Sequence, residues 1–179
     1  FYKRNDCRLC GSSKIELVLS LAPMPIATPN FAVPDTAKSH AIFQEAVPLE
    51  LHLCKDCGLL QLPHVGNPEI QYTNYVYTTS LSAGLTEHFK NYAGDVLEKL
   101  APSTDSLVVE MGSNDGTLLS FFKEAGMRVQ GVDPAQEIAR FATEQGIETY
   151  GTFFGETIAH QILAEKGPAS VMIANNVIA

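Results

Sequence analysis

Two short cysteine motifs constrain this chain more than any other feature. Each has the pattern Cys-x-x-Cys-Gly, at Cys7, Cys10 and Gly11 and again at Cys54, Cys57 and Gly58. Two thiolates three residues apart can bind one metal ion if the backbone turns tightly, and a following glycine permits that turn. Four such thiolates form the closed ligand set of a structural zinc site, so we predict one zinc ion here. Two disulfides, or four free buried thiols, are the alternative interpretations.

A small subdomain must fold between the two motifs, because 43 residues separate Cys10 from Cys54. Residues 20–48 contain five of the ten prolines, so we expect them to be extended and irregular. His52 and His64 lie near the second motif, and we expect them to be surface strand residues rather than ligands.

Period-two alternation predicts a strand over residues 48–54, with three leucines on its buried face, Leu49, Leu51 and Leu53. The pattern of residues 59–63 predicts the return strand, which places the second cysteine motif at the tip of a hairpin. A domain of this size rarely buries enough apolar surface to be stable without a bound metal or another cross-link. We therefore expect residues 1–72 to form a small, β-rich zinc-binding domain.

A polar and aromatic stretch, residues 71–80, follows and contains Tyr72, Tyr75 and Tyr77. Apolar side chains then recur at helical spacing over residues 85–100, which predicts an amphipathic helix that Ser80 or Ser82 caps and Pro102 ends.

From residue 106 the pattern alternates between apolar strands and helices. The expected strands are 106–111, 127–132, 147–150 and 170–174, and the expected helices are 115–125, 135–145 and 156–166. This alternation is typical of a parallel sheet covered on both faces. The fold class is therefore α/β, a partial Rossmann-like sheet in residues 73–179. Since the chain stops soon after the fourth strand, we expect it to be part of a longer protein and inactive alone.

The first of these strands ends in a loop of the kind that binds nucleotides. Glycines at a strand-to-helix turn let a ligand approach the backbone and the unpaired N–H groups of the helix. The loop contains Gly112 and Gly116, but Thr117 stands where a dinucleotide fingerprint has its third glycine. Glu110 suits a ligand with a cationic amino-acid end. A tight turn without a ligand is the plainer alternative.

The pattern Glu110-x-Gly112-x-Asn114-x-Gly116 resembles motif I of class I methyltransferases that use S-adenosylmethionine. Asp133 ends the second strand, where an acid binds ribose hydroxyls. With the cysteine motifs, the Pro23–Ala27 segment, Tyr75-Val-Tyr77 and Gly131-Val-Asp133-Pro134, the chain resembles S-adenosylmethionine-dependent sugar C-methyltransferases of deoxysugar biosynthesis. Members of that family carry an N-terminal zinc-binding domain.

This resemblance implies C-methylation of a nucleotide-linked keto-deoxysugar, with a thymidine-diphosphate sugar as the expected partner. A base removes the proton α to the carbonyl, and the enolate carbon attacks the sulfonium methyl group. Tyr77, or else Tyr75, is the candidate base or substrate contact, although a tyrosine of pKa about 10 is a poor base at neutral pH. The implied cofactor contacts are Glu110, Gly112, Ser113, Asn114, Asp115, Gly116, Asp133, Pro134, Phe153 and Asn175.

Composition excludes other classes of partner. The net charge is −8, and an acidic surface repels phosphate backbones, so we expect no nucleic-acid partner. No apolar run approaches the roughly 20 residues that span a bilayer, so we expect no membrane partner and a cytoplasmic location. Two other functions stay open: a zinc-stabilised recognition module with a non-catalytic sheet, and a nicotinamide-binding sugar enzyme.

Overall fold

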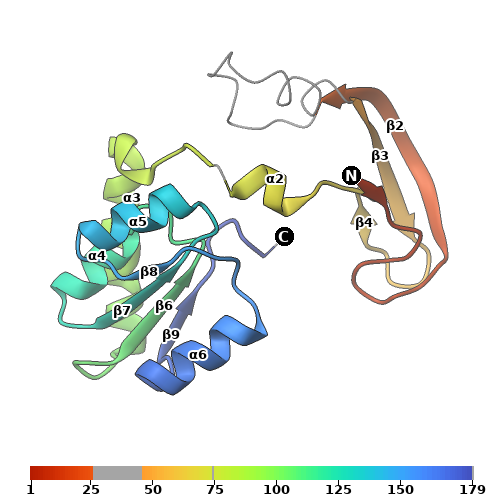
Figure 1. The fold of residues 1–179 in the computed structure, drawn as a ribbon. Helices are drawn as coiled ribbons and strands as arrows, with labels where there is room; N and C mark the ends of the chain where they lie inside the picture. The colour runs from red at the N-terminus through yellow and green to blue at the C-terminus, as the bar shows by residue number, and fades with distance from the viewer. Residues whose placement is uncertain (26–45, 74, 179) are drawn as a thin grey trace, which may run out of the picture. The chain divides into compact units, whose positions relative to one another are not determined.

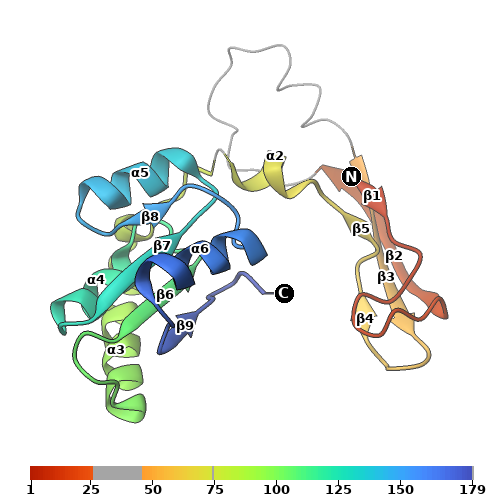
Figure 2. The same ribbon diagram turned by 60° about the horizontal axis from the view of Figure 1, so that its bottom comes forward.

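The structure is a computed structural model that describes residues 1–25, 46–73 and 75–178. The chain divides into two compact units, Phe1–Gln71 and Tyr72–Ala179, which we describe separately. Figure 1 shows the β-rich first unit and the α/β second unit, and Figure 2 shows each from another side. A mixed α/β chain with a parallel sheet, preceded by a β-rich part that holds the cysteine cluster, confirms the predicted fold class.

Two small antiparallel sheets form the first unit. β2 (Ile15–Pro25), β3 (Ala46–Cys54) and β4 (Leu60–Gln61) lie side by side in that order, and β1 (Tyr2–Lys3) pairs with β5 (His64–Val65). The predicted hairpin is confirmed, because β3 and β4 pair through His52 with Gln61 and Leu53 with Leu60. α2 (Pro68–Tyr72) follows β5.

Strand β2 corrects the expectation of an irregular chain from residue 20. Its pairing with β3 continues as far as Pro25, although Pro23 and Pro25 lack an N–H group. The strand tolerates them because, within the described part of the chain, β2 has a neighbouring strand on one side only, and its register shifts between Leu21 and Met24. Residues 26–45, which complete the proline-rich stretch, lie outside the described residues.

Burial along β3 is the reverse of the prediction. Leu49, Leu51 and Leu53 are only partly buried, whereas His52 and Cys54 on the other face are buried. The expectation that His52 lies at the surface is therefore wrong, and its Nε2 lies 3.1 Å from a carboxylate oxygen of Glu50. The buried face is the one that carries a cysteine of the metal cluster.

The first unit has almost no hydrophobic core among its described residues. Its buried side chains are Cys7, His52, Cys54, Gln61 and Pro63. Both hydrophobic clusters found among residues 1–25, 46–73 and 75–178 belong to the second unit. Metal binding, rather than apolar burial, must therefore supply much of the stability of the first unit.

The second unit opens with η1 (Thr79–Leu81) and α3 (Ala83–Leu100). Ser82, one of the two predicted caps, is the residue before the helix, although its side chain makes no capping hydrogen bond. The helix ends at Leu100, and the next residue, Ala101, caps it in a left-handed conformation with φ 42° directly before Pro102.

Four parallel strands then alternate with three helices. The elements are β6 (Leu107–Met111), α4 (Thr117–Glu124), β7 (Arg128–Val132), α5 (Gln136–Glu144), β8 (Thr149–Tyr150), α6 (Glu156–Lys166) and β9 (Val171–Ile173). The strands lie in the order β8-β7-β6-β9, so the order reverses after β6. In doubly wound sheets ligands bind at such a reversal, beyond the carboxyl ends of the strands.

Cores form on both faces of this sheet. Val108 of β6 lies in a buried cluster with residues of α3, α4 and α5. The largest fully buried side chain of this cluster is Phe122 of α4. Leu107 and Val109 lie in a second cluster with Ile158 and Ile162 of α6. The predicted cover on both faces is confirmed, and it holds the strand ends rigidly in place.

No helix within the described ranges is both long enough and apolar enough to cross a membrane.

Candidate metal and cofactor sites

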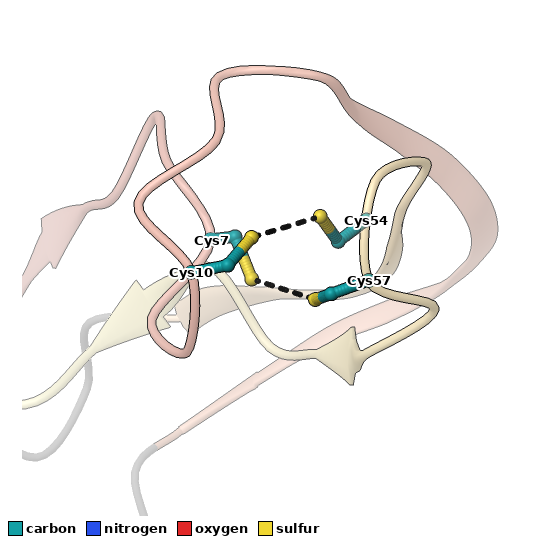
Figure 3. Close-up of side chains that lie close together, drawn as sticks. All are labelled: Cys7, Cys10, Cys54 and Cys57. Carbon is teal, nitrogen blue, oxygen red and sulfur yellow. Dashed lines mark hydrogen bonds between the residues drawn. The ribbon is translucent and has the colours of Figure 1, made fainter.

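The four cysteines converge, as Figure 3 shows. All four sulfur atoms lie within 4.8 Å of one another, with 3.6 Å between Cys7 and Cys57 and 3.7 Å between Cys10 and Cys54. A tetrahedral zinc ion with Zn–S bonds of about 2.3 Å requires sulfur atoms about 3.8 Å apart. The residues present therefore fit zinc.

The two cysteine motifs fold in the same way. In each motif the glycine N–H donates to the carbonyl of the first cysteine at 2.9 Å, Gly11 to Cys7 and Gly58 to Cys54. Both glycines have positive φ, 73° and 78°, and nothing lies near the place of a Cβ atom. Backbone conformation, rather than space, therefore requires glycine at these positions.

The cysteine thiols differ in how easily they ionise: burial and neighbouring thiols raise the pKa of Cys10 and Cys57, whereas hydrogen bonds favour the thiolate of Cys7. The N–H of Cys10 is the main group that lowers the pKa of the Cys7 thiol, to about 6. Deprotonated sulfur is the form that ligates zinc.

A buried glutamine links the first motif to the hairpin. Gln61 accepts a hydrogen bond from the N–H of Arg8 and donates one to the carbonyl of Asp6, both at 2.9 Å. Inside the second motif, the Asp56 carboxylate accepts from Ser12 and pairs with Lys14. These contacts link the first motif to the hairpin that carries the second motif. Gln61 could not be found from the sequence, because its strand position alone does not show a partner 53 residues away.

Three carboxylates gather in the second unit, beyond the strand-order reversal. Glu110 lies near the end of β6, Asp133 follows β7, and Asp115 lies in the loop between β6 and α4. All three are buried. Among the described residues, no lysine, arginine or histidine forms an ion pair with any of them.

Electrostatics in this cluster disfavour negative charge on Glu110. Burial raises the pKa of Glu110 well above its usual range, and the nearby charges of Asp133 and Asp115 raise it further. Burial also raises the pKa of Asp133, although the backbone N–H groups of Ala135 and Asn114 partly oppose this. A bound cation would stabilise the ionised form of this cluster.

Several buried polar atoms near the same strand ends have no hydrogen-bond partner in the described ranges of the chain. They are Glu110 Oε2, Ser113 Oγ and Asn175 Nδ2. Leaving such atoms unpaired is costly, so together they fit a polar ligand that completes their hydrogen bonds. These three residues were predicted cofactor contacts, and that role stays a prediction.

The carboxylate of Asp133 holds the loop that precedes α4. It accepts hydrogen bonds from the N–H of Asn114 at 2.9 Å and from the N–H of Ala135 at 2.8 Å. Gly112 and Gly116 both have positive φ, 67° and 78°. The end of β7 thus fixes the glycine loop, which the sequence predicted as the binding segment.

The side chains of Asn114 and Asp115 bind another part of the chain. Asn114 donates to the carbonyl of Tyr77 and accepts from the N–H of Thr79, both at 2.9 Å. Asp115 accepts from the N–H of Ser80 at 2.8 Å. The sequence does not point to Thr79 and suggests Ser80 only as a possible helix cap, because backbone contacts leave no signature in side-chain chemistry.

The remaining predicted residues lie in varied surroundings. Tyr77 is exposed, Tyr75 is partly buried, and their ring centroids are 6.4 Å apart. Phe153 is exposed, whereas Phe154 packs against the α6 core. Pro134 is partly buried next to Asp133. Their predicted roles with cofactor or substrate stay predictions.

Two comparisons show which known proteins this chain is similar to. Residues 7–72 match a methyltransferase-family model described as "Putative zinc binding domain". The chain is also similar to C-methyltransferase NovU of Streptomyces niveus, with 32% identity over 168 residues. That alignment covers 94% of this chain and 39% of NovU, so the chain spans about two fifths of the length of this relative.

These findings confirm the predicted resemblance to C-methyltransferases with an N-terminal zinc-binding domain. The cysteine cluster and the matched domain together support zinc as the metal of the first unit.

The metal centre leads to a first prediction. Metal analysis should find one zinc per chain, and Cys54→Ser should release it and unfold the first unit, because little else in that unit is buried. Hydrogen exchange of residues 1–71 would report the unfolding. Leu9→Ala is the matched control, since Leu9 lies inside the first motif but is 72% exposed. A disulfide between any two of the cysteines in the native protein would contradict the zinc site.

A second prediction concerns pH. Because the folded state holds the Glu110 proton more tightly than the unfolded state, Glu110 weakens stability as pH rises above its ordinary pKa of 4.5. Glu110→Gln cannot titrate, so its advantage in free energy of unfolding over the parent should grow from pH 5 to pH 8. Urea unfolding at several pH values measures this.

Glu124→Gln is the control, because Glu124 is exposed on α4 and the same substitution there should leave the pH dependence unchanged. A constant difference between Glu110→Gln and the parent across the pH range would refute the raised pKa.

Proposed function

We propose that this chain belongs to an S-adenosylmethionine-dependent C-methyltransferase that acts on a nucleotide-linked keto-deoxysugar. The observation that carries the proposal is the buried carboxylate cluster at the strand-order reversal, with Glu110 Oε2 unpaired. A cationic ligand is electrostatically complementary to this cluster, whereas the cluster would repel a pyrophosphate. Similarity to a C-methyltransferase supports the same choice.

In this proposal the chain's own residues bind the cofactor along the carboxyl edge of the sheet. Glu110 would accept from the ammonium group, and Asp133 would accept from the ribose hydroxyls with its remaining lone pairs. Ser113 Oγ and Asn175 Nδ2, both unpaired, would complete the contacts to the amino-acid end. Phe153 is exposed beyond β8 and would lie against the adenine.

The bound sulfonium would supply an already activated methyl group. The protein must then hold the sugar, exclude water and move one proton. Tyr77 is the residue we propose to contact the sugar, because its ring is 42% exposed while its carbonyl is fixed to the glycine loop by Asn114. Tyr75 packs beside it and would orient its ring. One of the two would take or hold the α proton.

A third prediction tests the cofactor. In the protein at its full natural length, S-adenosylhomocysteine should bind in a calorimetric titration and NAD should not. Asp133→Asn should weaken that binding by about 1–3 kcal/mol, the scale of a hydrogen bond to a charged group. Asp105→Asn is the matched control, because Asp105 lies at the opposite end of β6 and is 82% exposed.

Circular dichroism should accompany this titration, since Asp133 also accepts two backbone N–H groups. Equal affinity of Asp133→Asn and the parent would remove Asp133 from the site. Binding of NAD instead would favour a nicotinamide enzyme.

A fourth prediction tests the reaction. With S-adenosylmethionine, the same protein should transfer a methyl group to carbon of a thymidine-diphosphate keto sugar, detected by mass spectrometry. Tyr77→Phe should lower turnover at least tenfold, because it removes the hydroxyl proposed to act on the sugar. Tyr2→Phe, at an exposed tyrosine of the first unit, should leave turnover unchanged. Cofactor binding without transfer to any keto sugar would favour a recognition module.

A further inference from the structure

The segment Tyr77–Ser80, here called the tyrosine segment, is attached to the glycine loop by side chains of that loop. Four hydrogen bonds make the attachment. Asn114 Nδ2 donates to the Tyr77 carbonyl at 2.9 Å, and Asn114 Oδ1 accepts from the N–H and hydroxyl of Thr79 at 2.9 and 3.3 Å. Asp115 Oδ2 accepts from the N–H of Ser80 at 2.8 Å.

These contacts use most of the hydrogen-bonding capacity of the two side chains. The Asn114 amide has its oxygen and its nitrogen bonded to the same segment, so turning it over would break both contacts. Asp115 divides its oxygens, because Oδ1 accepts from the N–H and hydroxyl of Thr117 at the start of α4. Little capacity is left for a ligand.

Asn114 also joins the tyrosine segment to the end of β7. Its backbone φ of 50° is left-handed, a conformation that asparagine tolerates better than most residues. In this conformation its N–H donates to Asp133 at 2.9 Å while its side chain binds Tyr77 and Thr79. One residue therefore connects the proposed ribose-binding acid to the proposed sugar-binding tyrosine.

We propose that Asn114 and Asp115 are positioning residues that hold the tyrosine segment on the glycine loop, so that the cofactor and sugar sites are assembled as one part. This proposal rests on the function proposed above for its catalytic consequence, but not for the attachment itself. It replaces the direct side-chain contact with cofactor that the sequence predicted for these two residues.

The test uses Asn114→Gly in the protein at its full natural length. Glycine keeps the left-handed backbone and removes only the side chain. Ala101→Gly is the matched control, because Ala101 is also left-handed, with φ 42°, and lies outside the glycine loop and the tyrosine segment. Asp115→Asn is the second variant. Its amide oxygen can still accept from Thr117, but its NH₂ group replaces the oxygen that accepts from the N–H of Ser80.

Of three readouts, we expect these two variants to change hydrogen exchange and kcat/KM, but to change cofactor affinity only slightly. Amide hydrogen exchange at Thr79 should be about tenfold faster in Asn114→Gly, and exchange at Ser80 should be faster in Asp115→Asn, since each loses bonds to those groups. The dissociation constant of S-adenosylhomocysteine should change less than about threefold. The kcat/KM for the keto sugar should fall about tenfold or more, and Ala101→Gly should change none of the three.

Unchanged exchange at Thr79 and Ser80 would overturn the attachment. A tenfold loss of S-adenosylhomocysteine affinity would overturn the positioning role and restore a direct cofactor contact. Faster exchange with unchanged kcat/KM would overturn the catalytic consequence. If the parent protein methylates no keto sugar, the proposed function fails, yet the exchange and binding readouts still decide the role of Asn114 and Asp115.

Discussion

The second unit buries three carboxylates together, Glu110, Asp115 and Asp133, and no cation among the described residues pairs with them. The arrangement of its strand ends and loops depends on this constraint. Parallel strands deliver Glu110 and Asp133 to the same edge of the sheet, and the turn into α4 brings Asp115 beside them. Burying like charges costs free energy unless protons or a ligand offset it. This cost, together with the unpaired polar atoms around the cluster, supports the proposal that a ligand binds here.

The first unit meets a different constraint. Its described residues bury little besides two cysteines, a histidine, a glutamine and a proline, so apolar packing cannot account for its fold. Two motifs of equal backbone geometry place four sulfur atoms at the spacing that zinc requires. Stability of this unit is thereby linked to metal binding, and the matched zinc-binding family covers nearly the same residues.

Much of this organisation could be predicted from sequence, for identifiable reasons. The cysteine spacing specified a metal site because sulfur chemistry leaves few alternatives, and apolar strands alternating with helices specified the parallel sheet. Strand β2 was missed because prolines normally argue against a strand, and only its edge position explains the exception. The buried face of β3 was misassigned because leucines outweigh a histidine in any hydrophobic pattern, whereas the metal cluster decides which face is inside.

The loop residues show a further limit of sequence reasoning. Asn114 and Asp115 match a cofactor motif by position, yet their side chains bind the backbone of residues 77–80, some 35 positions earlier in the chain. A motif records which residues occur together, but not which partner each one takes. Only the folded chain shows that Thr79 and Ser80 are those partners.

The most direct test of the central claim is a crystal structure of the protein at its full natural length with S-adenosylhomocysteine. The account predicts that the amino group of the ligand lies within hydrogen-bond distance of Glu110, and that Asp133 accepts from its ribose hydroxyls. A ligand bound elsewhere, or one that leaves Glu110 Oε2 without a partner, would contradict it.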